Sequence, residues 1–239
     1  MHLYDRDGNP VYEVPNKSKG GMRPATLRDA KKLNLVPSVT EILKIMSAPG
    51  LEQWKQDQMI QAALTEPRID GETDGEFIAR IKQTGKEHAR IAADRGTMIH
   101  SEIENAFLLK QTTEIGESVR GYTLNITSVD SWGVERPFSH QLGFGGRVDF
   151  WGDPPCVVDF KTKEKLSKKN DWPEHIMQLA AYRFGLCLPE DARLINVYVS
   201  WDGDIVHKEW TSEDGEHGLD GFLRCLNLWK WAKNYNPSF

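Results

Sequence analysis

Two short apolar runs joined by a tight turn restrict the possible folds of this chain more than any other feature. Residues 146–151 and 156–161 are rich in Val, Phe and Trp, and Gly-Asp-Pro-Pro separates them. Val, Phe and Trp favour extended backbone, whereas Gly and Pro favour turns. The pattern therefore predicts two neighbouring strands of one sheet. Similar runs at residues 122–132 and 134–138 predict two more strands before them.

The segments before these strands have the apolar spacing of helices. Ser38 is a predicted N-cap, and Thr97 is another after a break at Arg95-Gly96. Helices are expected over residues 39–46, 51–64, 75–94 and 97–110. The first thirty residues mix Gly, Pro, Asn and charge without periodicity, which predicts an irregular or extended leader.

The segments after the strands predict a helix, a hairpin and a final helix. Asp171 and Glu174 have capping-box spacing before a helical pattern that runs to residue 186. Residues 194–201 and 205–210 predict a hairpin turned by Asp202-Gly203-Asp204, and residues 213–233 predict a helix.

This order of elements predicts an α/β or α+β fold, with a mixed central sheet flanked by helices and a helical N-terminal half. The 239 residues, 39% of them hydrophobic, are enough for one sizeable core. A single domain over residues 1–239 is therefore expected. Its leader and helical part would span residues 1–94, and its catalytic core residues 95–239.

Charge and cysteine content argue against several classes of protein. A net charge of −5 does not suit a protein that coats nucleic acid, but it permits an enzyme whose carboxylates hold divalent cations. Three scattered cysteines (Cys156, Cys187 and Cys225) make no CxxC pair, which argues against a disulfide framework, a zinc site or an iron–sulfur cluster. The chain shows no membrane-spanning run and no secretory signal, so we expect a cytoplasmic protein without a membrane partner.

Three residues on the two central strands carry the strongest chemical signal. Asp159 and Lys161 share one strand face because side chains alternate with period two, and Phe160 then points into the core. Asp149 lies on the neighbouring strand. Carboxylates beside an ammonium suit the hydrolysis of a phosphodiester by a water bound to Mg²⁺ or Mn²⁺. The Asp-x-Lys tripeptide alone is more often a solvated strand face, so the prediction depends on this context.

Four motifs occur in an order that resembles the PD-(D/E)xK nuclease superfamily, and within it the RecB-like exonucleases. The motifs are RGTMIHSEIE, GFGGRVDF, VVDFKTK and QLAAY, within a resemblance that covers about residues 37–186. The segment PSVTEILKIMSAPGLEQWK also resembles the opening of phage-encoded exonucleases and of the mitochondrial genome maintenance exonuclease. The combination is specific, although each motif alone is common.

The resemblance implies a role for each matched residue. His100, Asp149, Asp159 and the backbone carbonyl of Phe160 would ligate one or two Mg²⁺ or Mn²⁺ ions. The catalytic set would be Asp149, Asp159, Lys161, Gln178 and Tyr182, the last two lying one helical turn apart and facing the site. Two departures stand out: Asp159 replaces the Glu of many relatives, and three cysteines cannot form the iron–sulfur cluster of some branches.

Several further residues have two readings. Glu104, one turn beyond His100, and Glu135 are either additional metal-proximal carboxylates or ordinary solvated side chains. Basic residues either contact DNA or lie on a solvated surface. The candidates for DNA contact are Arg95, Arg147, Lys163, Lys165, Lys168 and Lys169.

The expected function is a metal-dependent DNA exonuclease of phage or bacterial recombination, replication or repair. It would act on single strands or ends, leave 5′-phosphates and work in the host cytoplasm if phage-encoded. An endonuclease on the same scaffold and a DNA-binding subunit with an inactive site are alternatives. A hydrolase of small phosphates would not need the basic run after Lys161.

Overall fold

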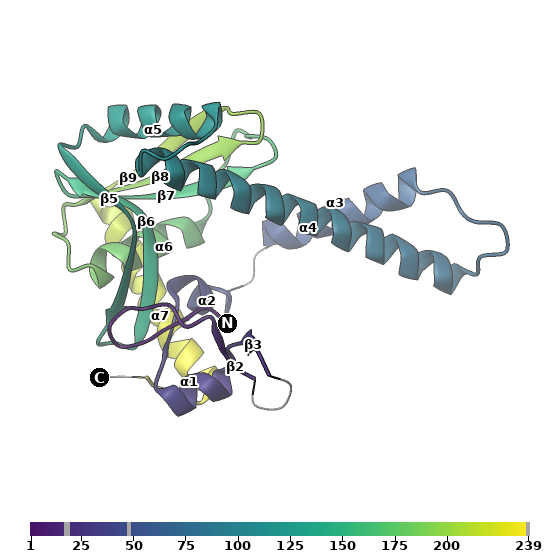
Figure 1. Ribbon diagram of the computed structural model, residues 1–239, viewed down its shortest axis with the longest axis horizontal. Helices are drawn as coiled ribbons and strands as arrows, with labels where there is room; N and C mark the ends of the chain where they lie inside the picture. Colours follow the sequence, from purple (N-terminus) through teal and green to yellow (C-terminus); the bar gives the residue numbers. More distant parts are fainter. Residues whose placement is uncertain (17–19, 47–48, 238–239) are drawn as a thin grey trace. The chain divides into compact units, whose positions relative to one another are not determined.

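The computed structural model describes residues 1–16, 20–46 and 49–237 (Figure 1). By their contacts these residues divide into two compact units. The first unit consists of Met1–Met46 and Glu102–Phe239, and the second consists of Ser47–Ser101. The protein is a mixed α/β protein, and the first unit holds its five-stranded sheet.

The sheet has the strand order β5-β6-β7-β8-β9. Its strands are β5 (Ser131–His140), β6 (Phe144–Asp153), β7 (Cys156–Lys163), β8 (Arg193–Ser200) and β9 (Ile205–Trp210). Neighbours pair antiparallel except β7 and β8, which are parallel. A parallel pair needs a crossover, and helix α6 (Pro173–Gly185) supplies it. The predicted mixed sheet, its central turn and its last hairpin are confirmed.

Helix α6 packs against the C-terminal helix α7 (Ser212–Lys233), and Figure 1 shows the two side by side. Thr211 caps α7 by accepting a hydrogen bond from the Asp214 amide. The apolar faces of both helices join the sheet in one core, because both carry apolar residues at helical spacing. Fully buried members of this core include Phe144, Val157, Leu179, Phe222 and Trp229.

Helix α6 does not begin where the sequence predicted. Its N-cap is Trp172 rather than Asp171, and Pro173 is the first helical residue. The amide of Trp172 donates a hydrogen bond to Nδ1 of His175, so a histidine takes the part expected of Glu174. The start of this helix determines which of its later side chains, Gln178 and Tyr182 among them, face the sheet.

The expected leader, irregular or extended, is confirmed for much of its length, but it contains paired strands and ends in a helix that the sequence did not predict. Strands β1 (Leu3–Tyr4) and β4 (Val36–Pro37) pair, as do β2 (Glu13–Pro15) and β3 (Met22–Pro24), and helix α1 (Leu27–Leu33) follows them. Residues 17–19 of the leader lie outside the described residues. The segment contacts the rest of its unit: Ser38 bridges Gly145 of β6, and the Tyr235 hydroxyl lies 2.9 Å from the carbonyl oxygens of both Ala30 and Leu35, between which its single proton is shared. The predicted cap is confirmed, because Ser38 Oγ accepts from the Glu41 amide at the start of α2 (Val39–Leu43).

The second unit contains helix α3 (Pro49–Thr65) and most of helix α4 (Asp74–Phe107). The predicted break at Arg95-Gly96 is wrong, since α4 continues through it. Thr97 is not a cap: its hydroxyl donates to the Ala93 carbonyl one turn earlier, within the helix. The predicted apolar stripe is confirmed by the burial of Ile99, Ile103, Ala106 and Phe107.

Helix α5 (Glu114–Thr127) replaces most of the strand expected over residues 122–132. Thr113 caps its start, and Ser128 ends it in the left-handed region. Its buried residues, Gly116, Val119, Thr123 and Thr127, follow one another at intervals of three or four residues. This is a helical period, although the β-branched composition of the segment had favoured a strand. Among the described residues, no helix is long and apolar enough to cross a membrane.

Candidate active site

The candidate site lies where strands β6 and β7 separate. Their pairing runs from Gly152 and Cys156 to Phe150 and Val158, and the next residues in register are Asp149 and Asp159. At that point a side chain replaces the backbone pairing between the two strands: Asp149 Oδ2 accepts a hydrogen bond from the Phe160 amide at 2.9 Å. The backbone N–H and C=O of one strand residue point to the same side. The carbonyl of Phe160 therefore also points toward β6, beside the Asp149 carboxylate.

Asp159 is a buried carboxylate, only 1% exposed, with donors on both oxygens. Oδ1 accepts from Gln178 Nε2 at 2.7 Å, and Oδ2 accepts from Asn196 Nδ2 at 2.8 Å. Lys161 Nζ lies 3.1 Å from Oδ1 and 2.9 Å from Oδ2. Such donors and a nearby cation are what a buried carboxylate needs in order to remain ionised.

The Lys161 side chain extends from this buried carboxylate toward solvent. Its side chain is 24% exposed, against 2% for that of Asp159. Its Nζ also donates to Gln178 Oε1 at 2.9 Å. The predicted alternation along β7 is confirmed, because Phe160 points the other way and its ring lies 6.0 Å from that of Phe107. An ammonium in this position can meet an anion from solvent without leaving the carboxylate.

Gln178 and Tyr182 reach the network from helix α6, one turn apart, as the sequence predicted. The Gln178 amide donates to Asp159 and, at 2.9 Å, to the Tyr182 hydroxyl, while its oxygen accepts from Lys161. Gln178 thereby uses both N–H groups and its oxygen. Burial raises the pKa of the Tyr182 phenol well above its usual value, so the hydroxyl stays neutral. The tyrosine contacts Gln178 and supports the carboxylate through it.

Asn196 is a member of the network that sequence reasoning missed. It is fully buried on β8, and the parallel register places it across from Asp159. The indole N–H of Trp210 on β9 donates to its Oδ1 at 2.9 Å. The only available signal was a single polar residue inside the apolar run LINVYV, and the partner strand of that run was unknown.

A second charged group lies beside Asp149. Glu135 falls across from Asp149 in the β5–β6 register and forms an ion pair with Arg147. Burial raises the pKa of the Glu135 carboxyl to about 7, the charges of Asp149 and Glu104 add to the rise, and Arg147 opposes it. Asp149 and Glu104 therefore both lie within electrostatic reach of Glu135. Arg147 already has an internal partner in Glu135, and the predicted metal-proximal role of Glu135 and DNA-contacting role of Arg147 stay predictions.

The raised pKa of Glu135 predicts a pH-dependent stability. Its folded pKa of about 7 lies above the ordinary 4.5, so the folded state holds this proton more tightly, and the stabilisation is lost as pH rises through about 7. We expect Glu135→Gln, which cannot ionise, to gain about 1–3 kcal/mol relative to the wild type between about pH 5 and about pH 8. Urea denaturation at both pH values measures this. Glu164→Gln, at an exposed position, is the control. An equal stability difference at both pH values for Glu135→Gln would refute the expectation.

His100 and Arg95 belong to the second unit, and Glu104 to the first. His100 is half-buried on α4, directly after the buried Ile99. Arg95 Nη1 lies 4.0 Å from Met98 Sδ. The predicted roles of His100 as a ligand and of Arg95 in DNA binding stay predictions.

The basic run after β7 separates into two kinds of lysine. Lys163 is half-buried at the end of the strand, where Nζ donates to the Asn170 carbonyl at 2.7 Å and burial lowers its pKa. Lys165, Lys168 and Lys169 are exposed on the following loop. Asn170 orders that loop by accepting the Ser167 amide and donating to the Ser167 carbonyl. Three of the four predicted DNA-contacting lysines thus face solvent, whereas Lys163 supports the loop.

The oxygen atoms available as metal ligands at this site suit a hard cation. Two carboxylates and a backbone carbonyl (Asp149, Asp159 and Phe160) are the oxygen ligands that Mg²⁺ or Mn²⁺ prefers. Within the described residues, no three His, Cys, Asp or Glu side chains are grouped so as to hold a metal ion by themselves. Lys161 contacts both oxygens of Asp159, so a cation that binds this carboxylate must replace one of those contacts.

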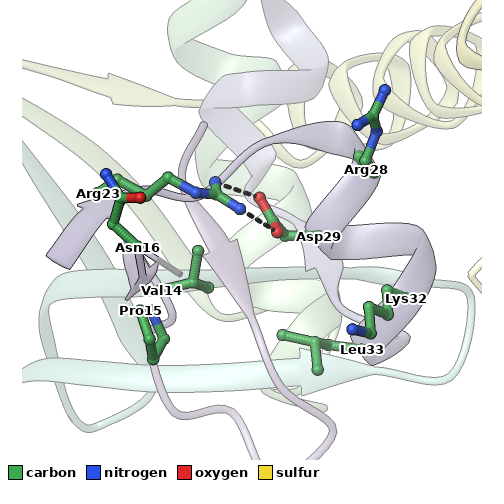
Figure 2. A pocket seen from close by; sticks show the side chains of 8 residues that line it. All are labelled: Val14, Pro15, Asn16, Arg23, Arg28, Asp29, Lys32 and Leu33. Carbon is green, nitrogen blue, oxygen red and sulfur yellow. Dashed lines mark hydrogen bonds and ion pairs between the residues drawn. The ribbon is translucent and has the colours of Figure 1, made fainter. Parts of the chain in front are cut away.

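A cavity of about 360 Å³ lies elsewhere, between the β2–β3 hairpin and α1 (Figure 2). Arg23 donates to both carboxylate oxygens of Asp29 at 2.7 Å. Figure 2 shows the Arg28 guanidinium pointing away from that pair. No residue of the candidate site lines this cavity.

Neither a scan against protein-family models nor a search of curated proteins finds a match to this chain. A search of solved structures finds similar chains, among them one described as "Crystal structure of SSO0001". That chain is 16% identical, and the match covers 73% of this chain and 85% of that one with a TM-score of 0.33. At that TM-score the likeness carries no argument about fold or function.

Proposed function

We propose that this chain is a metal-dependent deoxyribonuclease with a PD-(D/E)xK core, acting as an exonuclease on DNA. One observation carries the proposal: the buried carboxylate of Asp159 and the ammonium of Lys161 meet at the point where β6 and β7 separate beside Asp149. A buried, paired carboxylate at a break in a sheet is expensive to maintain, and such sites are usually functional. The resemblance of four ordered motifs to RecB-like exonucleases supports the same reading.

The carboxylates of Asp149 and Asp159 and the carbonyl of Phe160 would hold Mg²⁺ or Mn²⁺, with Glu104 as a further candidate ligand. When bound, such an ion would lower the pKa of a coordinated water molecule and place positive charge beside the phosphate. Lys161 would orient that water or offset charge that builds on the phosphate oxygens. Gln178 would hold the side chains of Lys161 and Asp159 in place relative to each other, because it is hydrogen-bonded to both.

The proposed substrate is DNA, as single strands or ends, cleaved to 5′-phosphate products. The exposed lysines Lys165, Lys168 and Lys169 follow the end of strand β7 at Lys163, and we expect them to contact the backbone of bound DNA. The preference for ends over internal sites, and a place in recombination, replication or repair, rest on family analogy.

A cleavage assay tests the proposed function. The substrates are end-labelled single strands, linear duplex and closed circles, each with Mg²⁺, Mn²⁺ or chelator. Cleavage of linear DNA that requires metal and releases short products from ends supports the exonuclease. Cutting of closed circles assigns the site to an endonuclease on the same scaffold. DNA binding without cleavage in either metal indicates an inactive binding subunit, and cleavage in chelator refutes the mechanism.

The lysine loop predicts a salt-dependent effect on binding. We expect the triple variant Lys165→Ala, Lys168→Ala, Lys169→Ala to raise the KM for single strands about 10-fold at low salt. The slope of log affinity against log salt concentration should become shallower by about 2, because each lost phosphate contact reduces that slope by about 0.7. The control removes three exposed lysines elsewhere, Lys86, Lys110 and Lys233. Equal effects of the two triple variants would show that net charge, and not this loop, sets the affinity.

A further inference from the structure

Asn196 is a buried polar side chain whose described hydrogen bonds join Asp159 of the candidate site to Trp210 on strand β9. It is fully buried on β8, an inner strand of the sheet. Its Nδ2 lies 2.8 Å from Asp159 Oδ2 and 3.4 Å from the Asp159 carbonyl oxygen. A buried amide is costly unless it is hydrogen-bonded, and an apolar residue of similar volume would pack at this position without that cost. Packing of the sheet alone therefore does not account for an asparagine here.

Trp210 determines which way the Asn196 amide faces. Its Nε1 donates to Asn196 Oδ1 at 2.9 Å, and an indole N–H can only donate. The oxygen of the amide must therefore face Trp210, and the NH₂ group must face Asp159. The three residues lie on three neighbouring strands, in a row formed by β7, β8 and β9. The sheet itself thus aims a donor at one oxygen of the carboxylate.

The other described partners of the carboxylate are not locked by a neighbouring strand in this way. Lys161 contacts both oxygens from the same strand, and Gln178 contacts Oδ1 from helix α6. Asn196, in contrast, donates to Asp159 Oδ2 from the adjacent strand, and its own orientation is fixed by Trp210. Any cation that binds Asp159 displaces a Lys161 contact, and the carboxylate then needs another partner to keep its orientation.

We propose that Asn196, oriented by Trp210, is a positioning residue that holds the Asp159 carboxylate for cation binding and cleavage. This inference rests on the proposed nuclease function. A buried asparagine cannot touch DNA, so its loss is expected to lower kcat and weaken metal activation while leaving the KM for DNA unchanged. A purely structural role would instead lower thermal stability without that pattern.

The test compares Asn196→Leu, Trp210→Phe and Trp229→Phe. Trp229 is a buried tryptophan whose Nε1 has no hydrogen-bond partner among the described residues, so Trp229→Phe matches the volume change without losing such a bond. We expect kcat to fall about 100-fold in Asn196→Leu, which loses a hydrogen bond to a charged group, and about 10-fold in Trp210→Phe, which loses a hydrogen bond to a neutral amide. The Mg²⁺ concentration for half-maximal activity should rise several-fold in both. Trp229→Phe should match the wild type in both quantities.

Binding of Mn²⁺, followed by titration calorimetry without DNA, separates this inference from the proposed function. If the wild type binds Mn²⁺ but cleaves no DNA, the nuclease proposal fails, and weaker Mn²⁺ binding in the two variants still supports the positioning role. If the wild type is active and Trp210→Phe and Trp229→Phe behave alike, the positioning role is refuted. A wild type that neither cleaves DNA nor binds Mn²⁺ refutes both. Trp210→Phe keeps the test decisive even if Asn196→Leu does not fold.

Discussion

Asp149→Asn is expected to lower the rate of DNA cleavage at least about 1000-fold while leaving the fold intact. The substitution removes a negative charge that a cation needs, and loss of one preorganised electrostatic group commonly has an effect of this size. The asparagine side-chain oxygen can still accept the Phe160 amide, so the junction of β6 and β7 keeps its hydrogen bond. Single-turnover cleavage of a labelled strand in saturating Mg²⁺ measures the loss.

The same variant has a readout that does not depend on activity. The charge of Asp149 helps to raise the pKa of Glu135, so its removal should lower that pKa from about 7. Titration of the Glu135 carboxyl by NMR detects the change. Asp220→Asn on α7 removes an equal charge from an exposed position and should alter neither quantity. Cleavage by Asp149→Asn within about 10-fold of the wild-type rate would remove Asp149 from the mechanism.

Lys161→Met is expected to abolish cleavage and to destabilise the fold by about 3 kcal/mol, because removal of one partner from a buried ion pair leaves the other charge uncompensated. Asp159 is 1% exposed, and the donors Gln178 and Asn196 that it would keep are both neutral. Urea denaturation near neutral pH measures the loss of stability.

A double variant distinguishes the ion pair from loss of side-chain packing. Adding Asp159→Asn to Lys161→Met removes the stranded charge, so the double variant should recover most of the lost stability and stay inactive. Lys163→Met offers a comparison two residues along the same strand, where the lysine donates to a backbone carbonyl and the buried carboxylate is not affected. If Lys161→Met and Lys163→Met lower stability equally, the Asp159–Lys161 pair has no special role in the fold.

Local sequence patterns predicted the strands and helices that carry the central residues. Alternation along 156–161 placed Asp159 and Lys161 on one face and Phe160 in the core, and helical spacing placed Gln178 and Tyr182 one turn apart. These predictions succeeded because each depends on a short period that the chain itself shows. The four side chains Asp159, Lys161, Gln178 and Tyr182 do form one connected network.

Other features depend on tertiary pairing that no local pattern reveals. Asn196 lies across from Asp159 only because β8 is parallel to β7 in a particular register. The N-terminal segment packs with the unit that holds the sheet through contacts such as Tyr235 with Ala30, which are about two hundred residues apart in the chain. Helix α4 continues past Gly96 although glycine disfavours helix, because propensity is a weak constraint in a long helix.

The position of Mn²⁺ in crystals grown with a short single strand, located by its anomalous scattering, tests the central claim most directly. The proposed mechanism predicts an ion in contact with the carboxylates of Asp149 and Asp159 and with a phosphate of the strand. No ion at saturating Mn²⁺, or an ion that touches neither carboxylate, would contradict it.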